Sequence, residues 1–188
     1  MKPFRSKGFT IVYPGTAITI RSLVRIGFVR DNKDFQLPPF EDKFLACWDT
    51  GATKSCIKES IAKHYNLPSI GEIICRGINS ENKVKVYLAS IFLPNETVIN
   101  EIELCSHDDT LNIDLLIGMD IISMGELLVS TSDGITAFSF QSPAATVLTL
   151  NSIPLRPKVS FEINQSFNPD MLCPCGSEKI FNKCCGKR

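Results

Sequence analysis

Short apolar segments alternate with polar turns over the first 140 residues of the chain. Apolar and polar positions alternate through residues 16–29, and "GFTIVY" (8–13) is rich in β-branched and aromatic side chains, as strands are. Similar patterns predict further strands at 44–48, 71–78, 83–93, 97–105 and 126–140. The last of these is a hairpin that turns at Asp133-Gly134, and a polar, proline-bearing stretch over 31–43 predicts a loop. The pattern therefore indicates a mainly β fold.

The period of the apolar positions changes downstream of the 44–48 strand. Apolar side chains recur at every fourth position, at Ile57, Ile61 and Tyr65. This spacing predicts one short amphipathic helix. Asn66 can adopt the left-handed conformation at its C-terminal end, and Pro68 prevents its continuation. A second short helix is expected after the apolar run that Gly118 interrupts.

The strand pattern decays after residue 140, where prolines punctuate a stretch without clear periodicity. Four cysteines then fall within thirteen residues at the end of the chain. We therefore expect three parts: a β domain over 1–140, a linker or arm over 141–168 and a small cysteine-rich module over 169–188.

Composition narrows the classes of function. The 188 residues are 44% hydrophobic, which is enough to fill a core, and twenty basic residues balance twenty acidic ones. A neutral chain gives no electrostatic basis for general binding to nucleic acids or membrane surfaces. No segment approaches the roughly 18 apolar residues of a membrane span, and the apolar run before Pro14 is too short for a signal peptide. We expect a cytoplasmic protein.

The eight cysteines form two groups. The first four, Cys47, Cys56, Cys75 and Cys105, are scattered through apolar segments, so we expect free thiols that pack like small hydrophobic side chains. The other four are Cys173, Cys175, Cys184 and Cys185. Four thiolates at this spacing suit a closed, tetrahedral, structural Zn²⁺ site, one per chain. Disulfides or free thiols in the tail are the alternative.

The stretch "CWDTGATKSCI" places Asp49 at the end of an apolar strand and at the start of a glycine turn. Asp-Thr-Gly is good turn chemistry, so a structural role is open. A carboxylate at a strand end can also be a reagent. About sixty residues later an apolar run ends at Gly118, and Asp120 follows, which we expect to be a helix N-cap.

These motifs together resemble those of the retropepsin-like aspartic peptidases, the clan of the retroviral proteases, over roughly residues 17–140. The matching stretches are "DTGAT" (49–53), the polar tip at 77–83 and "DLLIGMD" (114–120). The match is most similar to bacterial and DNA-damage-inducible members of the clan. The resemblance implies an acid-protease β-barrel with one or two short helices, and a homodimer in which two copies of Asp49 meet on a twofold axis.

The resemblance also implies roles for further residues. The catalytic loop would be supported by Thr50, Gly51, Ala52, Thr53, Ile117 and Gly118. The flap over the substrate would include Gly77, Ile78, Asn79 and Ser80. Trp48, which precedes the aspartate, is expected in the core or in a dimer contact.

The tail "CPCGSEKIFNKCCGKR" resembles the SEC-C motif, a short zinc module at the C-terminus of the protein-export motor and of many bacterial proteins. Metal binding would supply the folding energy of so small a module. The resemblance implies contacts with a protein or ribosome partner.

The sequence supports one leading function and two alternatives. The leading hypothesis is an aspartic endopeptidase that hydrolyses a peptide or protein substrate between two Asp49 carboxylates, with the zinc tail recruiting a partner. One alternative is a non-catalytic module with the same fold that binds peptides or proteins. The other is a zinc adaptor in which Asp49 is only a turn residue.

Overall fold

The structure is a computed structural model that describes residues 7–30, 34–36, 42–76, 81–144, 179–180 and 183. The chain divides into two compact units, of which one comprises residues 1–20 and 122–188 and the other residues 21–121. Strands account for most of the described secondary structure, and both of the helices found there are short. The mainly β fold class is therefore confirmed.

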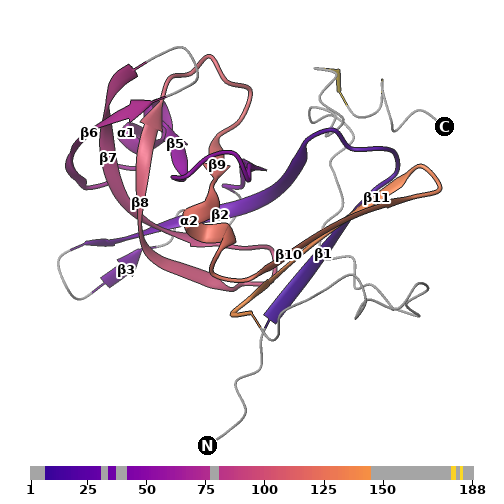
Figure 1. Ribbon diagram of the computed structural model, residues 1–188. Coiled ribbons are helices and arrows are strands. Elements are labelled where there is room, and N and C mark those ends of the chain that lie inside the picture. Colours follow the sequence, from indigo (N-terminus) through magenta and orange to yellow (C-terminus); the bar gives the residue numbers. More distant parts are fainter. Residues whose placement is uncertain are drawn as a thin grey trace, which may run out of the picture. The chain divides into compact units, whose positions relative to one another are not determined.

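An eight-stranded sheet forms the 21–121 unit (Figure 1). In chain order its strands are β2 (Ile20–Arg30), β3 (Asp34–Gln36), β4 (Phe44–Trp48), β5 (Cys56–Lys58), β6 (Ser69–Arg76), β7 (Glu81–Phe92), β8 (Val98–His107) and β9 (Leu115–Ile117). Their spatial order is β3-β2-β4-β9-β5-β8-β7-β6. Strand β2 also pairs with β7, which lies near the other end of that order, through Arg25↔Phe92 and its neighbours. The sheet thus closes on itself as a barrel.

Alternating burial along β4 shows how the barrel is filled. Phe44, Ala46 and Trp48 are buried, while the residues between them are partly exposed. The predicted strand 44–48 is confirmed at both ends. Strand β4 pairs in parallel with β9, whose Leu115 and Ile117 are fully buried. Burial at every second residue is the periodicity of a strand, although all five residues of β4 are apolar.

Helix α1 (Glu59–His64) begins later than the apolar pattern predicts. Ile57 was expected on the helix, and that prediction is wrong: it is a fully buried residue of β5. Strand β5 lies between β8 and β9 and pairs with both, so sheet hydrogen bonds outweigh the helical spacing of the side chains. Asn66 adopts a φ of 51°, which confirms the expected left-handed end of the helix.

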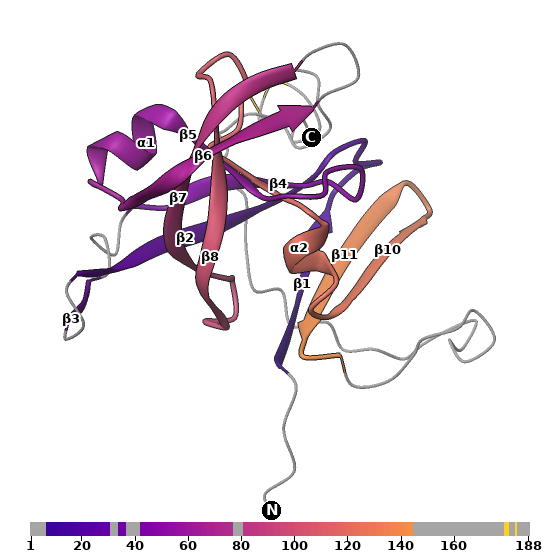
Figure 2. The same cartoon turned by 60° about the vertical axis from the view of Figure 1, so that its left-hand side comes forward.

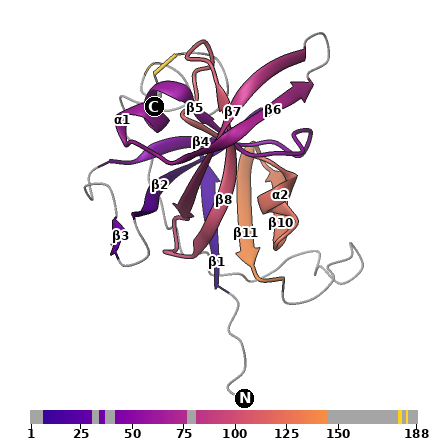
Figure 3. The ribbon, with the colours of Figure 1, turned by 90° about the vertical axis from the view of Figure 1, so that its left-hand side faces the viewer.

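Strands β6 and β7 form a long antiparallel hairpin, which Figure 3 shows running side by side. Several side chains of β6 are exposed, among them Ile73 and Ile74, which point to opposite faces of the strand. The predicted loop over 31–43 contains the short strand β3, so that prediction is wrong in part. The predicted strand over 16–29 begins only at Ile20.

A three-stranded antiparallel sheet, β1-β11-β10, belongs to the other unit (Figure 2). Its strands are β1 (Lys7–Tyr13), β10 (Glu126–Ser132) and β11 (Ile135–Ser142). Asp133 and Gly134 both have positive φ, 52° and 73°, as a two-residue hairpin turn of type I′ requires. The predicted hairpin and its turn are confirmed. Along the chain, helix α2 (Met119–Ile122) contains the point at which the 21–121 unit ends and the other unit resumes.

In the described part of the chain, neither helix is long and apolar enough to cross a membrane. The first four cysteines are free thiols, as expected.

Candidate functional site

Strand β4 carries Asp49 at its end, and hydrogen bonds to the segment around β9 hold it in place. Trp48 is the register partner of Ile117, and the backbone N–H of Asp49 donates to the carbonyl of Ile117 at 2.9 Å. At the start of β4, the Leu45 N–H donates to Asp114 Oδ2 at 2.8 Å, while the Asp114 N–H donates to the Leu45 carbonyl at 2.9 Å. Both ends of β4 are therefore fixed, and so is the backbone of Asp49.

The loop after β4 folds back onto the Asp49 carboxylate. The N–H of Gly51 donates to Asp49 Oδ1 at 2.8 Å, and the N–H of Ala52 donates to the Asp49 carbonyl at 3.2 Å. A Cβ at Gly51 would lie 3.1 Å from Asp49 Oδ1. Asp49 is half-buried, and Thr50, Gly51 and Thr53 are exposed. The backbone thus orients the carboxylate while the surface of the loop stays accessible.

Gly118 also lies against this loop. A Cβ there would lie 2.8 Å from the carbonyl carbon of Lys54 and 2.9 Å from the carbonyl oxygen of Ala52, so no larger residue fits without backbone movement. The Met119 N–H donates to that Ala52 carbonyl at 2.8 Å. The structure therefore brings Ile117 and Gly118 against residues 49–54, although some sixty residues separate them in the chain.

Ser55 and Asp120 form a polar tether beneath the loop. Asp120 accepts two hydrogen bonds from Ser55, from its N–H at 2.9 Å and from its hydroxyl at 2.6 Å. The fully buried Ser55 Oγ in turn accepts from the Gly118 N–H at 3.0 Å. Helix α2 begins at Met119, one residue before Asp120, so the prediction that Asp120 is the N-cap is wrong. Its carboxylate binds both donors of Ser55, and its Oδ1 also accepts from the N–H of Ile121, inside the helix, at 3.0 Å.

Trp48 is 7% exposed, and its indole N–H donates to Ser22 Oγ at 2.9 Å. The burial agrees with the expected core position of Trp48. A bulky residue before Asp49 is therefore accommodated inside the barrel, where its one polar atom has a partner.

Three structural residues of the site, Ser22, Ser55 and Asp114, were missed by the sequence analysis. Ser55 directly precedes β5, and Asp114 belongs to the "DLLIGMD" stretch, but their partners lie 63 to 69 residues away. Lys58 also reaches Asp114, through a 2.9 Å backbone bond and a 3.8 Å ion pair. The pattern of neighbouring residues in the sequence cannot predict contacts between residues so far apart in the chain.

Two groups of predicted site residues lie outside the described residues. They are the flap residues Gly77, Ile78, Asn79 and Ser80, and the proposed zinc ligands Cys173, Cys175, Cys184 and Cys185. Among the described residues, no group of three or more His, Cys, Asp or Glu side chains could hold a metal ion. The strands on either side of the predicted flap tip, β6 and β7, are described.

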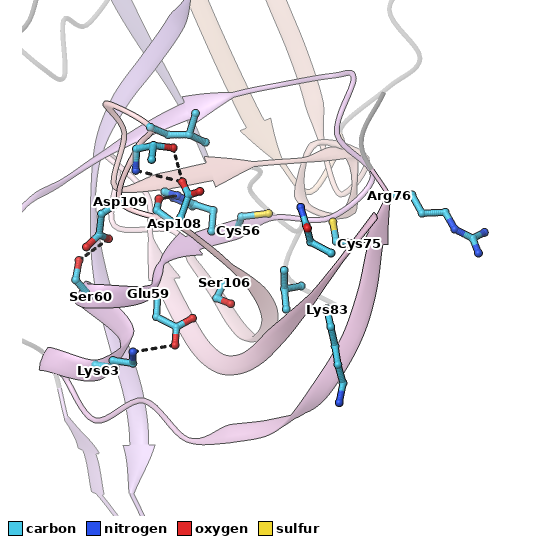
Figure 4. A pocket seen from close by; sticks show the side chains of 15 residues that line it. Cys56, Glu59, Ser60, Lys63, Cys75, Arg76, Lys83, Ser106, Asp108 and Asp109 are labelled. Atoms are coloured by element: carbon cyan, nitrogen blue, oxygen red, sulfur yellow. Dashed lines mark hydrogen bonds and ion pairs between the residues drawn. The ribbon is translucent and has the colours of Figure 1, made fainter. Parts of the chain in front are cut away.

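A pocket of about 930 Å³ lies within the 21–121 unit, between α1, the β6–β7 hairpin and the segment after β8 (Figure 4). Its walls mix thiols, hydroxyls and carboxylates, among them Cys56, Cys75, Ser106 and Asp109. Asp49 does not line it. The pocket has a size that fits a small molecule or a few side chains of a peptide.

Charged residues around this pocket are already paired. Glu59 binds Lys63 at 3.1 Å and Lys85 at 3.4 Å, and the hydrogen bond from Lys63 is the main reason why the pKa of Glu59 is lowered. Arg76 forms an ion pair with Glu81 at 3.2 Å and points away from the pocket in Figure 4. The pocket therefore has no single dominant charge.

No family model matches the sequence, and no curated protein matches it. Searches of solved structures do give matches. A retropepsin-like aspartic protease from Rickettsia conorii aligns with a TM-score of 0.47 and 14% identity, over 76% of this chain and 99% of that one.

Two further structures show a weaker likeness. The simian foamy virus protease gives a TM-score of 0.36 and 18% identity, over 54% of this chain and 92% of its own. The retroviral protease-like domain of Ddi1 from Leishmania major gives 0.36 and 14% identity, over 61% and 90%. A proposal about function must therefore rest on the residues of this chain and not on these alignments.

Proposed function

We propose that this protein is an aspartic endopeptidase that acts as a homodimer, with one Asp49 from each subunit. One observation carries the proposal. Asp49 projects from a strand end fixed by Ile117. The Gly51 N–H binds its carboxylate, and Gly118 lies close against the backbone of its loop, as the supporting roles implied by the resemblance require. A turn residue alone would not need the partly buried tether of Ser55 and Asp120 beneath it.

Two carboxylates are needed because each has a different task. Like charges held this close cannot both ionise, so the pair shares one proton. The ionised Asp49 takes a proton from a water molecule, whose oxygen attacks the peptide carbonyl carbon. The protonated Asp49 donates a hydrogen bond to the carbonyl oxygen. Collapse of the tetrahedral intermediate breaks the C–N bond, and the amine leaves with a proton from the pair.

Backbone hydrogen bonding suits Asp49 for this work. Because the Gly51 N–H holds Oδ1, the plane of the carboxylate is fixed before substrate arrives. Preorganised groups cost no reorganisation at the moment of reaction. The exposed Thr50 and Gly51 leave the loop accessible to a second copy of itself. A substrate would bind in extended form, as an added strand beneath the β6–β7 hairpin.

The tail has a separate role in the proposal. Cys173, Cys175, Cys184 and Cys185 would hold one structural Zn²⁺, and the folded module would recruit a protein or ribosome partner. Elemental analysis of protein purified under reducing conditions tests this part: about one zinc per chain supports it, and metal-free protein contradicts it.

A non-catalytic peptide-binding module is the second candidate. The observation that favours it is the 930 Å³ pocket, which lies beside the β6–β7 hairpin and does not include Asp49 among its walls. Such a module would bind peptides equally well with or without the carboxylate.

A comparison of two matched variants separates the candidates. A diverse peptide library is offered, at pH values from about 4 to 7, to wild type, to Asp49→Asn and to Asp133→Asn, and products are identified by mass. Asp133 occupies an exposed turn position where Asn fits equally well, so that variant controls for the substitution itself. Cleavage by wild type and Asp133→Asn, but not by Asp49→Asn, supports the peptidase. Equal peptide binding by all three without cleavage favours the module.

A further inference from the structure

Two cysteines of the barrel lie directly opposite each other on neighbouring strands. Cys56 on β5 and Cys105 on β8 are register partners of a parallel pair. Such partners point to the same face of a sheet, and their backbones stand about 4.8 Å apart. A disulfide joins residues whose Cα atoms are about 4.4–6.8 Å apart. Both cysteines are free thiols in the structure, so the pair is placed for a bond that it has not formed.

Access to the two sulfurs is unequal. Cys56 is half-buried and lines the 930 Å³ pocket, into which its side chain projects in Figure 4. Cys105 is 1% exposed and is not part of the pocket wall. A small molecule can therefore reach Cys56 from the pocket, while Cys105 can react only with a group already attached to Cys56.

Local electrostatics favour one thiolate in the pair. The neighbouring Cys56 thiol, followed by the positive charge of Lys54, lowers the pKa of Cys105 to about 7. The neighbouring Cys105, followed by burial, raises the pKa of Cys56. The two sulfurs titrate as a pair, and the thiolate of Cys105 can accept the proton that Cys56 loses when Cys56 reacts.

We propose that Cys56 is a modification site for low-molecular-weight disulfides and that Cys105 is its resolving thiol. The Cys56 thiolate attacks one sulfur of the disulfide RSSR, which forms Cys56–S–S–R and releases RS⁻. Cys105 then loses its proton and attacks the Cys56 sulfur, which forms the Cys56–Cys105 bond and releases the second RS⁻. The protein loses two hydrogen atoms, and RSSR is reduced to two molecules of RSH.

The resulting bond would be reversible. Side chains on neighbouring strands leave their Cβ atoms about as far apart as the strands themselves, beyond the roughly 3.8 Å that a relaxed disulfide prefers. Strain of this kind makes a disulfide easier to reduce. Ser55, the residue before Cys56, binds Asp120 and Gly118, so the strain would act beside the tether of the Asp49 loop. The site itself does not depend on the proposed peptidase activity.

Peptide mapping of the full chain tests the proposal. Reduced protein is exposed to oxidised glutathione, remaining thiols are alkylated, and the positions of all adducts are determined by mass. Wild type should give a peptide pair joined through Cys56 and Cys105, with the loss of two hydrogen atoms. In Cys105→Ala the glutathione adduct should persist on Cys56, and in Cys56→Ser the buried Cys105 should stay a free thiol.

Cys75 provides the matched control, because it is also half-buried and lines the same pocket. Cys75→Ser should form the Cys56–Cys105 bond as readily as wild type. A bond between Cys56 and Cys75, or a wild type in which Cys56 and Cys105 both remain thiols while Cys75 reacts, would overturn the proposal. The wild-type map alone decides this point, so it remains decisive if Cys105→Ala fails to fold.

Discussion

The three-stranded sheet and the loop that carries Asp49 are stabilised by different kinds of contact. In the sheet, Phe9 packs edge-on against Phe138 at 5.7 Å between ring centroids, and Phe138 and Phe140 are almost fully buried. In the loop, a buried serine, a carboxylate and several backbone N–H groups bond one another across more than sixty residues.

These two kinds of contact have different effects: apolar contacts mainly stabilise the fold, and hydrogen bonds mainly fix the positions of particular atoms. Apolar contacts are non-directional, so many combinations of side chains fill a sheet face equally well. Hydrogen bonds fix atoms in direction as well as in distance, and a buried donor without its partner is costly. We therefore expect the apolar sheet to contribute more to the free energy of unfolding. The hydrogen bonds of the loop mainly hold one carboxylate in one orientation.

Truncation in the sheet should give the largest loss of stability. Phe138→Ala removes a fully buried ring and should lower the free energy of unfolding of the 1–20 and 122–188 unit by about 3–5 kcal/mol. Urea unfolding followed by circular dichroism measures this loss. Leu128→Ala on β10 is the control, because Leu128 is 38% exposed and should cost about 0.5 kcal/mol or less. Equal losses in both variants would contradict an apolar core around Phe138.

Asp120→Asn should have the next largest effect, and it acts on the loop. The variant places an amide NH₂ group against one of the two Ser55 donors, so one charge-assisted hydrogen bond is lost, at about 1.5–3 kcal/mol. Amide hydrogen exchange should become faster at Ser55 and Gly118. Asp133→Asn, in an exposed turn, should leave both quantities unchanged. Unchanged exchange at Ser55 in Asp120→Asn would contradict the tether.

The two regions also differ in how much of them the sequence predicts. The apolar alternation of β10 and β11 and the Asp133-Gly134 turn are local signals, and the hairpin was predicted closely. Asp49 was singled out because it ends an apolar strand. The roles of Ser55 and Asp114 were missed, since their partners lie far along the chain.

Ile57 shows the opposite error. Its spacing to Ile61 and Tyr65 is helical, yet it lies in β5, which has a sheet partner on each side. The spacing of apolar residues indicates which side chains share a face. It does not indicate which distant strands are available to form backbone hydrogen bonds with a segment. The pairing of Cys56 with Cys105 was hidden for the same reason.

Gly118→Ala tests the close packing of Gly118 against the backbone of the Asp49 loop. The new Cβ would lie 2.8–2.9 Å from backbone atoms of Lys54 and Ala52, which cannot rotate away, so we expect a loss of about 1–3 kcal/mol in unfolding free energy. Gly51→Ala is the matched variant, because its Cβ would meet only the Asp49 carboxylate, at 3.1 Å. Thermal unfolding should show the larger shift for Gly118→Ala, and the reverse order would contradict the close approach.

Tyr65 combines both kinds of contact in one side chain and should show the smallest effect. Its ring packs edge-on against Phe44 at 5.5 Å, and its hydroxyl donates to Asp42 Oδ2 at 2.6 Å. Tyr65→Phe keeps the packing and removes only the hydrogen bond, so the loss should be about 1 kcal/mol.

Alkaline titration tests the polar half of Tyr65 separately. Burial, followed by the hydrogen bond to Asp42, raises the pKa of Tyr65 to about 12. Because the folded state keeps the phenol proton longer than the unfolded chain, the stability that this group contributes is complete below pH ~10 and is lost as pH rises toward ~12. Absorbance of the phenolate in wild type should therefore include a late step from Tyr65, which Tyr65→Phe should lack. Asp42→Asn should move the same step to lower pH without removing it, because burial is the larger cause. If Tyr65→Phe instead removes a step near the ordinary pKa of tyrosine, neither burial nor the hydrogen bond to Asp42 shifts this phenol, and the polar contact contributes nothing at this position.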